Sequence, residues 1–75
     1  MPELRNVRPR DAIRAFERAG GHATRGRGDH VNIKMPNGQI VTIVDTREPA
    51  KIGILIGGIR KAGLTTEEFI ELLKG

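Results

Sequence analysis

The chain has 75 residues, a formal net charge of +4, no cysteine and only two aromatic side chains. This length predicts one small domain spanning residues 1–75, and the lack of cysteine excludes disulfides and cysteine-based zinc sites. Charged residues of both signs make up 29% of the sequence, which is typical of a folded, soluble domain and not of a disordered chain. The positive net charge favours an anionic partner, and nucleic acid is the first candidate.

Neither a membrane span nor a signal segment is expected. The longest apolar run, Ile52 to Ile59, has eight residues and includes three glycines, whereas a membrane-spanning helix needs about 20 apolar residues. The segment from Met1 to Arg5 lacks the apolar core of a signal peptide. We therefore expect a cytoplasmic protein without a membrane partner.

The positive charge is concentrated in the first half of the chain. Between Arg5 and Lys34 there are eight basic residues against three acidic ones, while the last eleven residues contain three glutamates and one lysine. An anionic partner should therefore bind to the N-terminal half.

The first predicted element is a helix that starts near Pro9, a residue suited to the first helical turn because its missing N–H costs nothing there. The glycine pair Gly20-Gly21 ends this helix. Its apolar residues recur at helical spacing and form a single stripe: Ala12, Ile13, Phe16 and Ala19.

Three strands are predicted next, over 22–27, 30–35 and 39–44. The first two are separated by Gly28-Asp29, and the second alternates apolar and polar residues as a half-buried strand does. Pro36-Asn37-Gly38 is a strong turn signal between the second and third strands. The three strands should form an antiparallel meander, followed by a polar loop at 45–49.

Two more helices complete the expected α-β-β-β-α-α order, an α+β fold with the sheet packed against helices. Apolar residues return at helical spacing over 52–62, and the three glycines within this stretch are interpreted as a close approach to the sheet or to another helix. Thr65 and Glu68 have the spacing of a capping box at the start of the last helix. Four apolar residues should face inward from it: Phe69, Ile70, Leu72 and Leu73.

His30 is the residue most able to carry chemistry. It follows the loop Arg25-Gly26-Arg27-Gly28-Asp29, which can place cations and backbone N–H groups beside it. An imidazole can act as general acid or base near neutral pH. RNA supplies its own nucleophile, the 2′-hydroxyl, so its cleavage requires a base, cations for the developing phosphate charge and a donor for the leaving oxygen.

Other readings of these residues remain open. A strand histidine can be structural or merely exposed, and binding of nucleic acid without catalysis fits the same side chains. With no Trp or Tyr, the chain should contact RNA through backbone and shape rather than by base stacking. A metal site built from His22, His30 and Asp29 or Asp45 has no supporting spacing, so no metal is expected.

Three segments together resemble the HicA (YcfA-like) family of small toxins. Residues 13–21 are similar to the family's opening helix, which ends at a glycine. Residues 28–38 resemble its Gly-Ser-His strand and the Pro-Asp-Gly turn that follows. Residues 51–64 resemble its Gly-Thr-Leu helix, which is closed by Ala-Gly-Leu. The capping box and the Glu-Glu-Phe that follow are also typical. The match runs from about Arg10 to Leu73. Asp29 replaces the family's serine before the histidine, and Ile54 replaces the threonine of Gly-Thr-Leu.

The resemblance implies a fold like the double-stranded-RNA-binding domain and the activity of an mRNA interferase. An mRNA interferase of this family is a toxin-type endoribonuclease that cleaves RNA without a metal or other cofactor. The family's catalytic histidine falls on His30, and its preceding glycine on Gly28. By charge and position, Arg25, Arg27 and Lys34 should bind RNA phosphates, and Gly28 is expected to belong to the same RNA-binding site. A HicB-like antitoxin is the implied protein partner. The alternative is a non-catalytic RNA-binding or protein-interaction module of the same fold.

Overall fold

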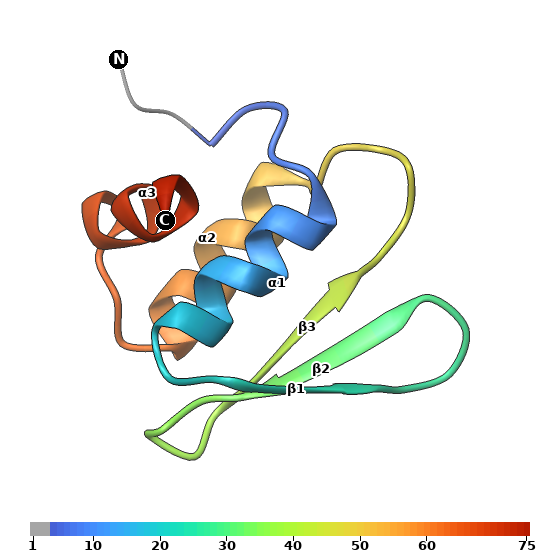
Figure 1. Cartoon of the computed structure of the whole chain (residues 1–75), viewed down its shortest axis with the longest axis horizontal. Helices are drawn as coiled ribbons and strands as arrows, with labels where there is room; N and C mark the ends of the chain where they lie inside the picture. The colour runs from blue at the N-terminus through green and yellow to red at the C-terminus, as the bar shows by residue number, and fades with distance from the viewer. Residues whose placement is uncertain (1–3) are drawn as a thin grey trace.

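The computed structural model describes residues 4–75 (Figure 1), so the first three residues of the N-terminal segment and of the predicted 1–75 domain lie outside the described residues. Its elements follow the predicted order and confirm a small α+β fold: α1 (Pro9–Arg18), β1 (His22–Arg25), β2 (His30–Lys34), β3 (Ile40–Val44), α2 (Ile52–Lys61) and α3 (Thr66–Lys74). No helix within residues 4–75 combines the length and apolar character that a membrane crossing requires.

The strands are one or two residues shorter than predicted because the chain turns earlier. The backbone N–H of His30 donates to the carbonyl of Arg27 at 3.0 Å, which makes Gly26 and Arg27 part of the β1–β2 connection. At the other hairpin, the N–H of Met35 donates to the carbonyl of Gln39 at 2.8 Å and closes the predicted Pro36-Asn37-Gly38 turn.

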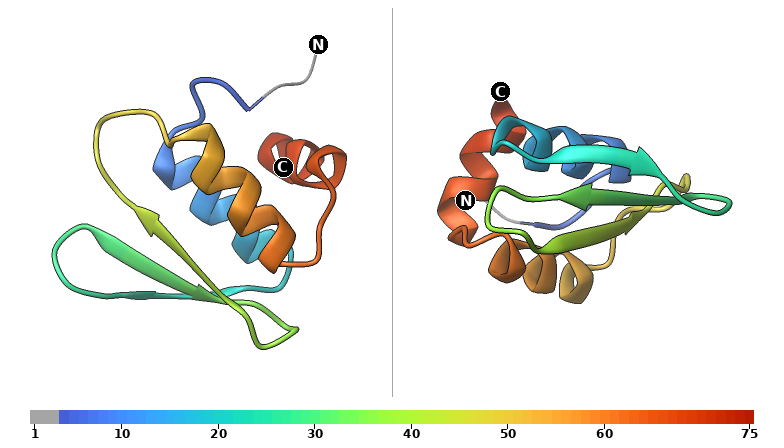
Figure 2. Two further views of the ribbon diagram at one scale, coloured as in Figure 1. Left: turned by 180° about the vertical axis from the view of Figure 1, so that it is seen from behind. Right: turned by 90° about the horizontal axis from the view of Figure 1, so that it is seen from below.

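The three strands form one antiparallel sheet in the order β1-β2-β3, as predicted. Side chains alternate between its two faces. Val31 and Ile33 of β2, with Val41 and Ile43 of β3, are buried beneath the helices. On the opposite side, here called the open face, no helix of the described residues 4–75 lies in front of the strands (Figure 2, right). The register places these residues on it: His22, Thr24, His30, Asn32, Lys34, Ile40, Thr42 and Val44.

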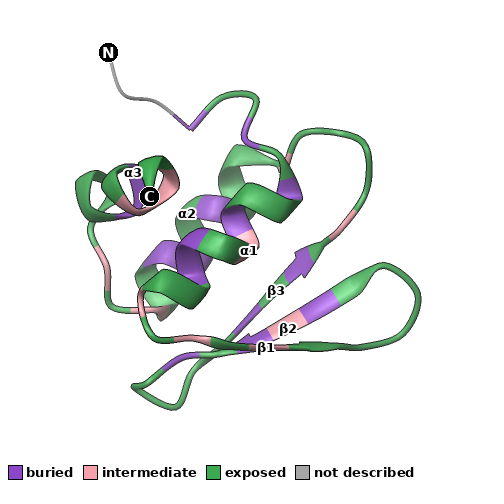
Figure 3. Cartoon of the chain, in the orientation of Figure 1, coloured by how far each residue is buried: buried purple, intermediate pink, exposed green. Residues whose placement is uncertain are grey.

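The helices cover only one side of the sheet. Helix α1 contacts all three strands, α2 contacts β3, and α3 packs against α1 and α2. Buried residues lie where these elements meet (Figure 3). At the centre, the rings of Phe16 and Phe69 are 4.8 Å apart between centroids, so the last helix is joined to the first through the core. Thr65 and Glu68 form the predicted capping box, with both reciprocal hydrogen bonds present.

The interpretation of the glycines in α2 is right for one residue and wrong for two. A β-carbon on Gly58 would lie 2.8 Å from Val41 Cγ1 and 3.2 Å from Phe16 Cζ, so this glycine does allow close approach. Around Gly53 and Gly57, by contrast, no atom of residues 4–75 other than the chain neighbours and the backbone of the surrounding helical turn lies within 4 Å of that position. Gly53 and Gly57 are exposed and lie four residues apart, so they share the outward face of α2. Gly58, the next residue, lies on the face that packs against the core.

Candidate functional site

The open face carries the predicted histidine at one end of the sheet. His30 is the first residue of β2 and pairs with Val44 of β3. The alternation that buries Val31 and Ile33 sends His30, Asn32 and Lys34 to the other side, where His30 and Lys34 are exposed. The histidine is therefore accessible to a large ligand lying across the strands.

One nitrogen of the His30 ring is held by the backbone. His30 Nδ1 lies 3.2 Å from the carbonyl oxygen of Arg27, the same oxygen that accepts the His30 backbone N–H at 3.0 Å. A carbonyl can only accept, so Nδ1 must carry the proton in this hydrogen bond. In the neutral ring the free lone pair then belongs to Nε2. The loop thus orients the imidazole and leaves Nε2 able to accept a proton from a ligand.

Gly28 gives the β1–β2 loop its shape. Its φ is +57°, a left-handed conformation that glycine adopts without the strain a β-carbon brings. Beyond Gly28 itself and its two chain neighbours, no atom of the described residues lies within 4 Å of where that β-carbon would be, so a ligand could reach the backbone here. The N–H of Asp45 donates to the carbonyl of Asp29 at 2.7 Å and connects the loop to the end of β3.

Lys34 shares the open face with His30 but lies at the far end of β2. The two residues are four positions apart on an extended strand, which corresponds to about 13 Å. Lys34 instead lies beside His22, its partner in the β1–β2 register. This spacing places Lys34 nearer to a neighbouring phosphate of a bound nucleic-acid strand than to a phosphate held at His30.

A polar row between these two ends was missed in the sequence. Thr24, Asn32 and Thr42 occupy matching positions on the three strands. Thr42 Oγ1 donates to Asn32 Oδ1 at 2.8 Å, and Thr24 Oγ1 donates to the backbone carbonyl of Asn32 at 3.4 Å. The turn at 36–38 could have revealed the Asn32–Thr42 pair, because a hairpin turn sets the register of its strands.

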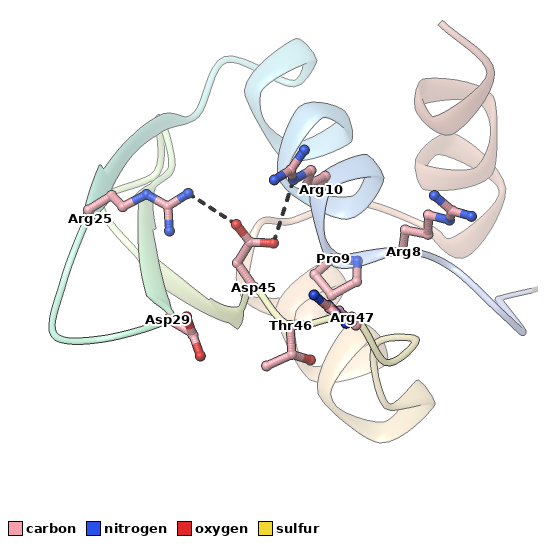
Figure 4. Close-up of a pocket in the computed structure, with 8 residues that line it drawn as sticks. All are labelled: Arg8, Pro9, Arg10, Arg25, Asp29, Asp45, Thr46 and Arg47. Atoms are coloured by element: carbon pink, nitrogen blue, oxygen red, sulfur yellow. Dashed lines mark hydrogen bonds and ion pairs between the residues drawn. The ribbon is translucent and has the colours of Figure 1, made fainter.

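Arg25 lies on the other side of the sheet from His30. Its register partner is Val31, whose side chain faces the helices. Arg25 Nη2 is 3.0 Å from Asp45 Oδ2, an ion pair drawn in Figure 4. Arg27, by contrast, lies in the loop next to His30 and is exposed. The structure therefore brings Arg27 and Gly28 together with His30 and separates Arg25 from them.

Within residues 4–75, no three His, Cys, Asp or Glu side chains lie close enough together to bind one metal ion. His22 and His30 lie at opposite ends of the open face. In comparisons with known proteins, no family model matches the chain and no curated sequence matches it.

Proposed function

We propose that this protein is a HicA-like, toxin-type endoribonuclease that cleaves RNA by acid–base catalysis at His30. One observation carries the proposal: the His30 ring is held through Nδ1 by the Arg27 carbonyl at 3.2 Å, on an exposed sheet face. That arrangement leaves the lone pair of the neutral ring on Nε2 of an exposed residue, which is what abstraction of a proton from a bound ligand needs. The three-segment resemblance described above supports RNA as that ligand.

In the proposed step, His30 Nε2 accepts the proton of an RNA 2′-hydroxyl. The 2′-oxygen attacks the adjacent phosphorus, the bond from phosphorus to the 5′-oxygen breaks, and the products are a 2′,3′-cyclic phosphate and a 5′-hydroxyl. Water protonates the leaving oxygen, because His22 and Lys34 lie about 13 Å away along the strands. Arg27 is the nearest basic residue in the chain and would balance charge on the phosphate.

The protein partner is part of the same proposal. A HicB-like antitoxin would neutralise the enzyme by covering the open face around His30, which the fold leaves without a helix (Figure 2, right). Co-expression with a HicB-like protein encoded beside this chain should abolish RNA cleavage and growth inhibition. Undiminished cleavage by a purified complex of the two would count against this partner.

The experiment is incubation of the purified protein with a long RNA in the presence of EDTA. We expect cleavage by the parent and none by His30→Ala. His22→Ala is the matched control, because it removes the same side chain from the same face at the far end of the sheet. Parental cleavage by His30→Ala would end the proposal, provided that circular dichroism shows both variants folded.

A non-catalytic RNA-binding module is the second candidate. It is favoured by the Thr24–Asn32–Thr42 row, which offers hydroxyl and amide groups to an RNA backbone without any catalytic group. RNA affinity that falls with salt, with no fragments produced, would support this module over the enzyme. A protein-interaction domain would show neither cleavage nor salt-dependent binding of RNA.

A further inference from the structure

A second basic feature lies on the helix side of the sheet, away from the open face. It is a cavity of about 810 Å³ between the start of α1, the β1–β2 hairpin and the loop after β3, here called the arginine hollow (Figure 4). Eight residues line it: Arg8, Pro9, Arg10, Arg25, Asp29, Asp45, Thr46 and Arg47.

Asp45 organises two of the four arginines. Its Oδ2 is 3.0 Å from Arg25 Nη2, its Oδ1 is 4.0 Å from Arg10 Nε, and its side chain is only 12% exposed. The side chains of Arg10 and Arg25 are 83% and 65% exposed. The carboxylate therefore lies beneath them, between the two arginines in Figure 4, and leaves their remaining N–H groups accessible to solvent.

The other two arginines leave the hollow with excess positive charge. Within residues 4–75, no carboxylate forms an ion pair with Arg8 or Arg47, and both residues are exposed. Among the described residues of the lining, four arginines against two aspartates give a charge of +2. Guanidinium groups bind phosphate through paired N–H donors. The arginines of the hollow therefore suit a phosphate better than a lysine ammonium, which is a single point charge, would.

The hollow and His30 meet at the same end of the sheet. Asp29, which lines the hollow, directly precedes His30, and Asp45 directly follows Val44, the register partner of His30. The hydrogen bond from the Asp45 N–H to the Asp29 carbonyl joins the two segments at 2.7 Å. An RNA strand that passes around this end of the sheet would thus contact both the hollow and His30.

We propose that the arginine hollow binds backbone phosphates of the RNA strand that is cleaved at His30. The choice of RNA rests on the proposed function. An acidic protein segment fits less well, because Pro9 is the only apolar side chain that residues 4–75 contribute to the lining and protein interfaces depend on buried apolar anchors. The hollow therefore extends the RNA site from the open face to the helix side of the sheet.

The test compares two double variants with the same loss of charge. Arg8→Gln/Arg47→Gln removes two positive charges from the hollow. Arg60→Gln/Lys61→Gln removes two positive charges from the C-terminal end of α2, about 14 Å from the first residue of that helix. The probe is a short uridine oligomer with 2′-O-methyl groups, which keeps the phosphates but removes the nucleophile. Its dissociation constant is measured at several salt concentrations.

Loss of two phosphate contacts should reduce the slope of log affinity against log salt by about 1.4, which weakens binding about 25-fold near 0.1 M salt. The Arg60/Lys61 pair should bind as the parent does. Equal weakening by both pairs would overturn the proposal, since net charge alone would then explain it. A parent without affinity for the oligomer, or one that binds oligoglutamate or inorganic phosphate as tightly, would overturn it too.

This assay is independent of cleavage. A protein that shows the predicted difference between the two pairs but never cuts unmodified RNA keeps the arginine hollow and loses the catalytic proposal. A protein that cuts RNA through His30 but shows no difference between the pairs keeps the catalytic proposal and loses the hollow. All four replaced side chains are exposed in the structure, so neither pair removes core packing.

Discussion

Replacing Gly57 of α2 with alanine should stabilise the protein, whereas the same replacement at the next residue, Gly58, should destabilise it. Both glycines lie inside one helix, so alanine removes the same backbone entropy penalty at each, about 0.8–1.0 kcal/mol. The surroundings differ. A β-carbon on Gly57 would meet no described residue beyond its own helical turn within 4 Å, but one on Gly58 would be 2.8 Å from Val41 Cγ1.

The magnitude at Gly58 follows from what would have to move. Val41 and Phe16, the two neighbours of the added methyl group, are 2% and 0% exposed, so neither can shift into solvent. Overpacking of a close-packed core costs about 1–3 kcal/mol. After the helical gain is subtracted, Gly58→Ala should lower the free energy of unfolding by about 0–2 kcal/mol. The two variants should therefore differ by about 1–3 kcal/mol.

Urea denaturation followed by far-ultraviolet circular dichroism measures this difference. For a domain of this size, 1 kcal/mol corresponds to about 4–8 °C in melting temperature, so thermal melts can resolve it as well. Gly53→Ala is a second open position and should behave as Gly57→Ala does. Stabilisation by Gly58→Ala equal to that by Gly57→Ala would refute the close packing of α2 on Val41 and Phe16.

Other variants test the cap, the ion pair and the core. Thr65→Ala should lower the free energy of unfolding by about 1 kcal/mol because the Glu68 N–H loses its acceptor, while Thr65→Ser should retain most of the stability. Asp45→Asn should lower it by less than about 1 kcal/mol, since its arginine partners are exposed, and the difference should vanish in concentrated salt. Phe69→Ala should lower it by about 3–5 kcal/mol, with Ile56→Ala as an exposed control; a similar urea midpoint for both would contradict the Phe16–Phe69 core.

Much of the fold could be predicted because it depends on residues close together in the chain. Thr65 and Glu68 form a capping box through contacts three residues apart, and Gly20 follows the end of α1 in a left-handed conformation with a φ of +100°. The alternation of β2 likewise predicted which side chains face the core. Apolar periodicity, helix capping and turn formation each depend on residues close together in the chain. The order of the elements and the antiparallel meander could therefore be predicted from them.

The candidate site could be predicted only in part. The sequence placed His30 at the start of a strand after a glycine loop, and that position is confirmed. It also grouped Arg25 with His30 because they are five residues apart, but strand pairing places Arg25 opposite Val31 and on the other side of the sheet. Nearness in sequence does not give the face of a sheet until the register is known.

By itself, then, the sequence determined the order of the elements, the strand that carries the histidine and the basic character of the first half. Only the tertiary structure decided that the Arg27 carbonyl holds His30 Nδ1 and that Gly58, unlike Gly57, meets the core. It also decided that Arg8, Arg25 and Arg47 line one hollow. These features join residues from separate elements, and packing around the buried core sets their distances, which no local pattern contains.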